Sequence, residues 1–326
     1  MERYILSLKE IYGGCMCTAI NETCGFHLFG RTLDLECSYG ENVVITPRGY
    51  RFRFLHGSEN DCRYAIVGAA HVVDNVPLYY DGMNEYGLCA AALRFANASV
   101  YHEKRGDKCN AASFELIPWF LRNCKDLAEA KGRLEKVNVT NDSFSQELPA
   151  TPLHWLVGDK SGAIAVESTE EGLKVYDAEQ GVLTNAPNFM TQCEILARSG
   201  ALDDVPSKSS PQLLEIPGDA SSSSRFVRAA FVKSRASIPE SQNEAISRLF
   251  RIFDTVSLPK GFSLSSDGRP MQTVYTSCMD SVGQTYYFFT YSCRQVRAVR
   301  MTEADAQGKE LRCFAMLSNE AVSFLN

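Results

Sequence analysis

Two long runs of apolar and small residues, at positions 64–73 and 87–95, constrain the fold of this chain more than any other feature. A strand with one face in water alternates apolar and polar side chains, whereas these runs are almost continuously apolar. Such runs are typical of strands that are buried on both faces. We therefore expect a sheet that is covered by other layers on both sides.

Around these runs, the spacing of apolar residues changes several times along the chain between the period of a strand and that of a helix. Short β-rich segments precede them, and two helical segments, a β-meander, two further helices and three strands follow without any linker. A Ser- and Pro-rich stretch at 206–211 is interpreted as a surface loop. This order predicts one layered α+β domain over residues 17–326. The predicted strands are 17–20, 26–35, 43–46, 64–73, 87–95, 153–158, 163–168, 173–176, 272–279, 285–291 and 296–301, and the predicted helices are 113–124, 126–137, 224–234 and 240–256.

Composition limits the classes of partner. The chain has 326 residues, of which 45% are hydrophobic and 22% charged, and no apolar run approaches the roughly 20 residues that span a bilayer. We therefore expect a soluble protein without a membrane partner. The net charge of -6, with scattered Lys and Arg, disfavours a nucleic-acid partner and favours a small-molecule substrate.

Twelve cysteines are spread over the chain, and the first sixteen residues do not have the apolar core of an export signal. We therefore expect reduced thiols in a cytoplasmic protein. No Cys or His spacing of the kind found in zinc sites occurs, so neither a metal nor a cofactor is expected.

Cys17 is the strongest candidate nucleophile because it directly follows Met16. If translation starts at Met16, or if residues 1–16 are otherwise removed, Cys17 gains a free α-amine whose pKa is about 7.7–8. That amine can take the proton of its own thiol, so no catalytic His is needed. Residues 1–16 are thus interpreted as a mis-assigned start or a short propeptide. The alternative is a true extension, in which Cys17 is an ordinary strand residue.

An N-terminal nucleophile needs groups that hold its amine, a cation near its thiolate and donors for the oxyanion. Asp34 could hold the amine, Arg31 could lie beside the sulfur and Asn185 could donate to the oxyanion. Each residue also has an ordinary interpretation. Arg31 and Asp34 could form an ion pair, Asn185 could be a turn residue, and Arg225 could be a solvated helix position.

Seven motifs in order change this balance, because together they resemble the choloylglycine hydrolase family of bile salt hydrolases and penicillin V acylases, within the N-terminal nucleophile hydrolases. The resemblance runs from Met16 to near the C-terminus. It implies an αββα four-layer sandwich, often assembled as a homotetramer, that hydrolyses linear amides without a cofactor. The motifs are Met16-Cys17-Thr18, Gly30-Arg31-Thr32-Leu33-Asp34, Val44-Ile45-Thr46-Pro47-Arg48, Asp81-Gly82-Met83-Asn84-Glu85-Tyr86-Gly87-Leu88, Leu183-Thr184-Asn185-Ala186-Pro187, Pro217-Gly218-Asp219 and Ser224-Arg225-Phe226.

The resemblance also implies roles for individual residues. Cys17 would be the nucleophile, Asn185 the oxyanion donor and Arg225 a further active-site cation, with Arg31 and Asp34 beside the sulfur and the amine. Four positions match residues that line the family's apolar acyl pocket, although an ordinary place in the core is an equal interpretation for them. They are Leu33, Val73, Tyr80 and Leu153.

Arg94 departs from the family pattern. Bile salt hydrolases have an active-site Asn at this position and penicillin V acylases typically have Tyr, whereas this chain has Ala92-Leu93-Arg94-Phe95. If the backbone N–H of residue 94 is the oxyanion donor, the chemistry survives. If an Asn side chain is needed, activity falls or the substrate range changes.

The function predicted from these motifs is hydrolysis of glycine- or taurine-conjugated bile salts, with possible exchange of the amino acid. Penicillin V or N-acyl-homoserine lactone acylase activity is the alternative enzyme. A protein of another class, which keeps the fold and only binds amphipathic anions, is also compatible with the residues. The selectivity loop at 207–215 matches neither a glycine nor a taurine preference.

Overall fold

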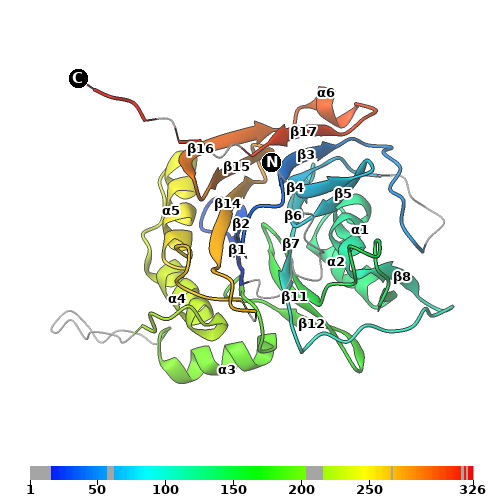
Figure 1. Ribbon diagram of the computed structural model, residues 1–326, viewed down its shortest axis with the longest axis horizontal. Coiled ribbons are helices and arrows are strands. Elements are labelled where there is room, and N and C mark those ends of the chain that lie inside the picture. Colours follow the sequence, from blue (N-terminus) through cyan, green and yellow to red (C-terminus); the bar gives the residue numbers. More distant parts are fainter. Residues whose placement is uncertain are drawn as a thin grey trace.

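The computed structural model describes residues 16–56, 62–202, 216–265, 267–316, 319–320 and 322–325. The interpretations of residues 1–15, of the loop at 206–211 and of the selectivity loop at 207–215 lie outside these ranges. Within them, two antiparallel sheets pack between two groups of helices, which gives an α+β fold of four layers (Figure 1). The predicted αββα sandwich is confirmed.

The first sheet has six strands in the order β13-β1-β2-β14-β15-β16. Its second strand in the chain is buried at every position, with neighbours on both sides. The sheet therefore has β2 near its centre. The strands are β1 (Thr18–Glu22), β2 (Leu28–Leu35), β13 (Val182–Leu183), β14 (Gln272–Asp280), β15 (Thr285–Thr290) and β16 (Cys293–Arg300).

The second sheet has nine strands, eight of them in the order β12-β11-β10-β7-β6-β4-β3-β17, with β5 paired to β4. A separate parallel pair is formed by β8 (Cys109–Ala112) and β9 (Val137–Thr140). The strands of the second sheet are β3 (Asn42–Thr46), β4 (Ile66–Val73), β5 (Val76–Tyr79), β6 (Asp81–Asn84), β7 (Cys89–Arg94), β10 (Leu153–Asp159), β11 (Gly162–Thr169), β12 (Gly172–Asp177) and β17 (Arg312–Ala315).

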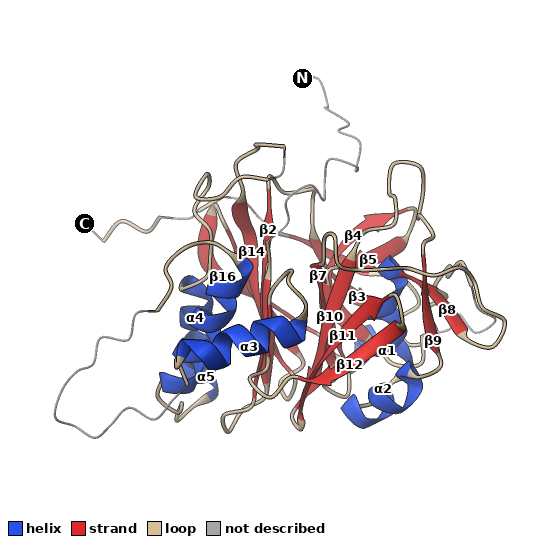
Figure 2. Cartoon of the chain, turned by 90° about the horizontal axis from the view of Figure 1, so that it is seen from below, coloured by secondary structure: helices blue, strands red, loops and turns tan. Residues whose placement is uncertain are grey.

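The helices form the outer layers. Helices α4 and α5 pack on the first sheet with α3 beside α4, whereas α1 and α2 pack on the second sheet (Figure 2). None of the helices in the described residues is long and apolar enough to cross a membrane. The helices are α1 (Leu116–Asn123), α2 (Leu127–Leu134), α3 (Phe189–Ser199), α4 (Ser222–Arg235), α5 (Gln242–Asp254) and α6 (Glu303–Ala306), with a 3-10 turn η1 (Ser113–Glu115) before α1.

The two apolar runs form β4 and β7, and both faces of β7 are buried as expected. Ala91 and Leu93 belong to the core between the sheets, while Ala90 and Ala92 belong to the core under α1 and α2. Alternate residues of a strand point to opposite faces, so a strand between two cores has neither face in water. The prediction of a sheet covered on both sides is confirmed.

Helix α5 shows why the predicted apolar stripe forms a helix here. The Ser241 hydroxyl caps its first turn by accepting a hydrogen bond from the Glu244 N–H, and Leu249 and Phe253 on the stripe are buried. Gly30 of β2 lets this helix approach, since a Cβ at that position would lie 2.2 Å from the Ser277 carbonyl oxygen and 3.0 Å from the Phe253 ring.

Two predicted helix boundaries were wrong, and one helix was missed. The segment 113–124 begins as the turn η1 before α1, and the segment 126–137 ends as a helix at Leu134, with Val137 starting β9. Helix α3 was not predicted, although Asn188 caps its start and Gly200 ends it in the left-handed region at φ 65°. Its buried face includes Gln192, and this polar side chain interrupts the apolar pattern.

Candidate active site

Cys17 lies at the start of β1, and it is completely buried. Its backbone N–H donates a hydrogen bond to Asn185 Oδ1 over 2.7 Å, across 168 positions of sequence. In this structure Met16 precedes Cys17, so the nitrogen belongs to a peptide bond. After removal of Met16, the same atom would be the α-amine, held by the same amide oxygen.

Arg225 of α4 joins Cys17 to Asn185, and its side chain is fully buried. Its Nη1 donates to the Cys17 carbonyl oxygen at 2.6 Å and to Thr18 Oγ1 at 2.8 Å. Its Nη2 donates to Asn185 Oδ1 at 2.8 Å. A guanidinium is a rigid fork of donors, so Arg225 fixes the relative position of the chain start and of Asn185.

The same contacts settle how the Asn185 amide is turned. Its Oδ1 accepts from two donors, so Nδ2 points the other way, and it donates to the Arg94 carbonyl oxygen at 2.9 Å. The amide N–H groups of Asn185 therefore lie at the end of β7, next to the position where the chain departs from the family pattern. The role of Asn185 as the oxyanion donor stays a prediction.

Three residues that the sequence analysis missed hold the backbone around Asn185. Gln192 of α3 donates to the Asn185 carbonyl and, at 2.8 Å, to the Pro187 carbonyl. Ser222 Oγ accepts from the Asn185 N–H at 2.8 Å, and His154 Nε2 is 2.7 Å from the Thr184 carbonyl oxygen. The sequence signal for Gln192 and His154 was that a polar residue interrupts an apolar segment, whereas Ser222 lies in a run of serines and had no such signal.

Asp34 of β2 is completely buried near Cys17. Burial raises the pKa of this carboxyl to about 7, the Cys17 thiol adds to the rise, and Arg225 and the Thr273 hydroxyl oppose it. Thr273 Oγ1 donates to Asp34 Oδ1 at 2.6 Å, and Thr32 Oγ1 donates to Oδ2 at 3.3 Å. The expected role of Asp34 in holding the free Cys17 amine stays a prediction, because in this structure the Cys17 nitrogen belongs to a peptide bond.

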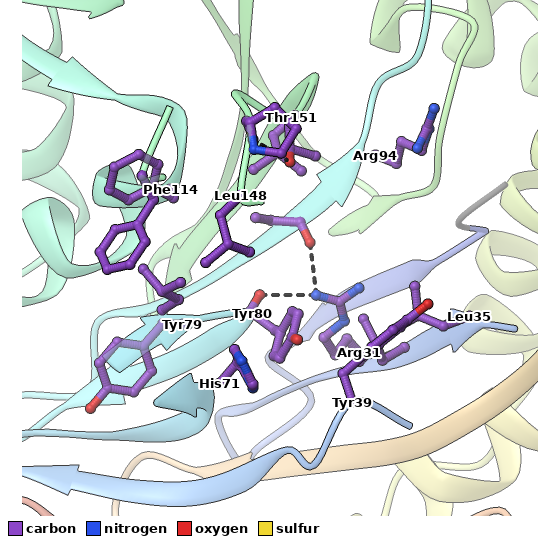
Figure 3. Close-up of a pocket in the computed structure, with 16 residues that line it drawn as sticks. Arg31, Leu35, Tyr39, His71, Tyr79, Tyr80, Arg94, Phe114, Leu148 and Thr151 are labelled. Atoms are coloured by element: carbon purple, nitrogen blue, oxygen red, sulfur yellow. Dashed lines mark hydrogen bonds between the residues drawn. The ribbon is translucent and has the colours of Figure 1, made fainter. Parts of the chain in front are cut away.

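Arg31 lies on β2 and is buried between the two sheets. Its Nη1 donates to the carbonyl oxygens of Tyr80 and Ala92, at 2.9 and 2.7 Å (Figure 3). The guanidinium thus joins the first sheet to the second at the wall of a cavity. Its role beside the sulfur stays a prediction.

The cavity has mostly apolar walls and contains about 830 Å³ of empty space, including its open mouth. Three of the four predicted acyl-pocket residues, Leu33, Tyr80 and Leu153, line it, whereas Val73 is not among its lining residues. The lining residues are Arg31, Leu33, Leu35, Tyr39, His71, Leu78, Tyr79, Tyr80, Ala92, Arg94, Phe114, Phe144, Leu148, Pro149, Thr151 and Leu153.

Arg94 lies at the end of β7 and also lines the cavity. Figure 3 shows its guanidinium directed away from Arg31. Burial raises the pKa of Glu36, and Arg94 is one of the cations that oppose this rise, so the two side chains are within electrostatic reach. In this structure the backbone carbonyl of Arg94, and not its side chain, contacts Asn185.

No group of three or more His, Cys, Asp or Glu side chains in the described part of the chain is arranged to hold a metal ion. The cysteines within those residues form no disulfide. Every group placed around Cys17 above is an ordinary side-chain or backbone donor or acceptor.

Comparison with known proteins gives consistent matches over nearly the whole chain. The family model of linear amide C-N hydrolases, choloylglycine hydrolase family, matches residues 15–314. A bile salt hydrolase/transferase of Lactiplantibacillus plantarum is 40% identical over 316 residues, which cover 93% of this chain and 98% of that protein.

Solved structures agree with these matches. A crystal structure of the conjugated bile acid hydrolase from Clostridium perfringens superposes with a TM-score of 0.85 at 29% identity, covering 96% of this chain and all of that chain. The penicillin V acylase from Agrobacterium tumefaciens has a TM-score of 0.73 at 24% identity, with 92% of this chain and 90% of that chain covered. The second similarity concerns the fold alone.

Proposed function

Because this chain belongs to the choloylglycine hydrolase family of linear amide C-N hydrolases, we propose that it hydrolyses the amide bond of glycine- or taurine-conjugated bile salts. The observation that carries the proposal is the position of the Cys17 nitrogen, which Asn185 and Arg225 hold at the start of β1. Its support from relatives is the 40% identical protein named bile salt hydrolase/transferase.

The reaction begins with removal of the residues before Cys17, which creates the α-amine. The amine takes the thiol proton, and the sulfur attacks the amide carbon to form a C–S bond and an oxyanion. Asn185 Nδ2 and the N–H of residue 94 stabilise that oxyanion, and Arg225 keeps Asn185 oriented. Collapse of the oxyanion breaks the C–N bond, and the α-ammonium donates its proton to the departing nitrogen.

Water then completes the cycle. The neutral amine accepts a proton from a water molecule as its oxygen attacks the thioester carbon, and the C–S bond breaks to release the bile acid. An amino acid that attacks in place of water forms a new amide, which is exchange of the conjugate. The apolar cavity beside Arg31 would hold the steroid part, with Leu33, Tyr80 and Leu153 in contact with it.

The decisive experiment incubates purified protein with glycine and taurine conjugates of bile acids and with penicillin V, with intact mass measured in parallel. We expect release of glycine or taurine by a chain that begins at Cys17, and none by Cys17→Ala. Full activity in a chain that keeps Met1–Met16 would rule out the amine as base. Turnover of penicillin V alone would support the acylase alternative, and binding of bile salts without turnover would support the binding-protein alternative.

We also propose that residues 17–326 act as one domain, that the active protein is a homotetramer and that it works in the bacterial cytoplasm. The assembly and the compartment are supported only by the family resemblance and by the absence of a predicted export signal. Light scattering coupled to gel filtration tests the assembly, because a homotetramer has four times the mass of one processed chain. Fractionation of the source cells tests the compartment.

A further inference from the structure

The cavity beside Arg31 is mostly apolar, and most of its polar groups are already used inside the protein. Arg31 donates to two carbonyl oxygens of the second sheet. Tyr79 Oη is 2.7 Å from Thr46 Oγ1, and Thr151 Oγ1 donates to the Pro149 carbonyl at 3.4 Å. These three side chains therefore shape the cavity without needing a polar ligand.

His71 is different. Its Nδ1 is buried, and within the described residues it has no hydrogen-bond partner. His71 lies on β4 opposite Leu78 of β5, and both side chains line the cavity. Figure 3 shows the imidazole below Tyr80, on the opposite side of the cavity from Arg94. The ring is thus placed to meet the body of a bound molecule, away from the end where residue 94 and Asn185 meet.

A second buried atom in the same wall, Tyr39 Oη, also has no hydrogen-bond partner of normal geometry within the described residues. The Cys37 thiol lies beside it and contributes to raising the pKa of Tyr39, after burial, which is the main cause. A thiol is a weak acceptor and a weak donor, so it satisfies this phenol only in part. His71 Nδ1 is the clearer case, because it has no hydrogen-bond partner within the described residues.

A buried polar atom without a partner is costly, and a ligand that supplies the partner removes that cost. The chemistry of the ring limits what the partner can be. Neutral imidazole Nδ1 either donates or accepts, depending on its tautomer, and an alcohol can do both. A methylene does neither, and a carbonyl oxygen only accepts. A hydroxyl group therefore fits His71 in either tautomer.

We propose that His71 forms a hydroxyl-binding subsite in this cavity, which selects acyl groups that carry an alcohol on their apolar body. The inference rests on the proposed function, because it assumes that the acyl part of the substrate occupies the cavity. It adds that the acyl part of the substrate, as well as the leaving amino acid, determines which substrates the protein prefers. This selectivity is independent of whether glycine or taurine leaves.

The test compares two glycine conjugates whose steroid parts differ only in ring hydroxyls, for example trihydroxy and monohydroxy cholanoates. The quantity measured is the ratio of their kcat/KM values. In His71→Phe, which keeps a ring but loses both nitrogens, we expect the preference for the hydroxylated conjugate to fall about 2- to 12-fold, the effect of one lost neutral hydrogen bond. His71→Asn, which keeps a polar atom close to Nδ1, should retain much of the preference.

Leu78→Met is the matched control, because it changes the residue opposite His71 without adding or removing a hydrogen-bonding group. It should affect both conjugates alike and leave the ratio unchanged. A ratio that stays the same in His71→Phe, or that falls equally in Leu78→Met, overturns the subsite. If His71→Phe does not fold, His71→Leu provides the same comparison.

A binding measurement separates this inference from the proposed function. If the wild-type protein hydrolyses no conjugate, the proposed function fails, and calorimetry of the free hydroxylated and deoxy acids with the Cys17→Ala protein tests the subsite alone. Tighter binding of the hydroxylated acid that is lost in a Cys17→Ala, His71→Phe double variant supports the subsite. Equal binding of the two acids to Cys17→Ala refutes it.

Discussion

Asp34→Asn should make the unprocessed protein more stable at neutral pH, although it removes an ionisable carboxyl group from the candidate site. In the folded chain the pKa of Asp34 is raised from 3.8 to about 7, chiefly by burial. Between these two values the unfolded chain has released the proton while the folded chain still holds it. Stability therefore falls as pH rises from about 4 to about 7, and it is level above that.

The magnitude follows from the size of the shift. One pKa unit corresponds to about 1.36 kcal/mol, so a shift from 3.8 to about 7 costs the wild type about 4 kcal/mol above neutral pH. At pH 4.5 only about 1 kcal/mol of this cost is present. Asn has no proton to lose, and its Oδ1 can still accept from the Thr273 hydroxyl. The stability difference between Asp34→Asn and wild type should thus grow by about 3 kcal/mol between pH 4.5 and pH 7.5.

Urea unfolding of both proteins at several pH values measures how the stability difference between them grows with pH. Effects of the substitution that do not depend on pH cancel when the differences at two pH values are compared. The chain that keeps residues 1–16 should be used, because its Cys17 nitrogen is a peptide nitrogen as in the structure. Asp267→Asn is the matched control. Asp267 is exposed and Ser265 lowers its pKa from 3.8, so its linkage effect lies below about pH 4 and the Asp267→Asn difference should stay level between pH 4.5 and pH 7.5. A difference for Asp34→Asn that does not grow with pH would falsify the reasoning.

Three further outcomes are expected. In Arg94→Asn the ratio of glycine- to taurine-conjugate kcat/KM should stay unchanged, because the Arg94 carbonyl makes the contact with Asn185; a changed ratio would show that the side chain acts in the site. In Gln192→Leu two backbone carbonyls near Asn185 lose their donor, so kcat should fall on the order of 10- to 100-fold with KM little changed, and steady-state kinetics with an unaltered kcat would contradict this. In Gly30→Ala a Cβ would lie 2.2 Å from the Ser277 carbonyl oxygen, so urea unfolding should show a loss of about 3 kcal/mol or more, and a stable variant would mean that β14 moves easily.

The parts of this protein that could be predicted from sequence depend on local patterns. The continuous apolar runs indicated β4 and β7 because neither face of a strand between two cores is in contact with water. The apolar stripe of α5 indicated its buried face in the same way. Cys17 could also be identified from the sequence, since a nucleophile that carries its own base is defined by one residue and the Met before it.

Helix α3 shows where local patterns fail. Its buried face includes Gln192, whose amide donates to the carbonyls of Asn185 and Pro187. A polar residue in a buried position is stable only when distant groups satisfy it, and those groups are not visible in the helix's own sequence. The same holds for His154, which contacts the Thr184 carbonyl from another sheet.

The tertiary structure alone decided which atoms meet at the site. Asn185 lies 168 positions from Cys17, yet its Oδ1 accepts a hydrogen bond from the Cys17 nitrogen. Pairing of β1 with both β2 and β13 brings these segments together, and Arg225 then fixes the Asn185 oxygen toward Cys17. The sequence by itself determined the kinds of chemical group and the layers that hold them. Packing of the two sheets determined their partners, because a hydrogen bond depends on distances of a few tenths of an ångström that no sequence spacing specifies.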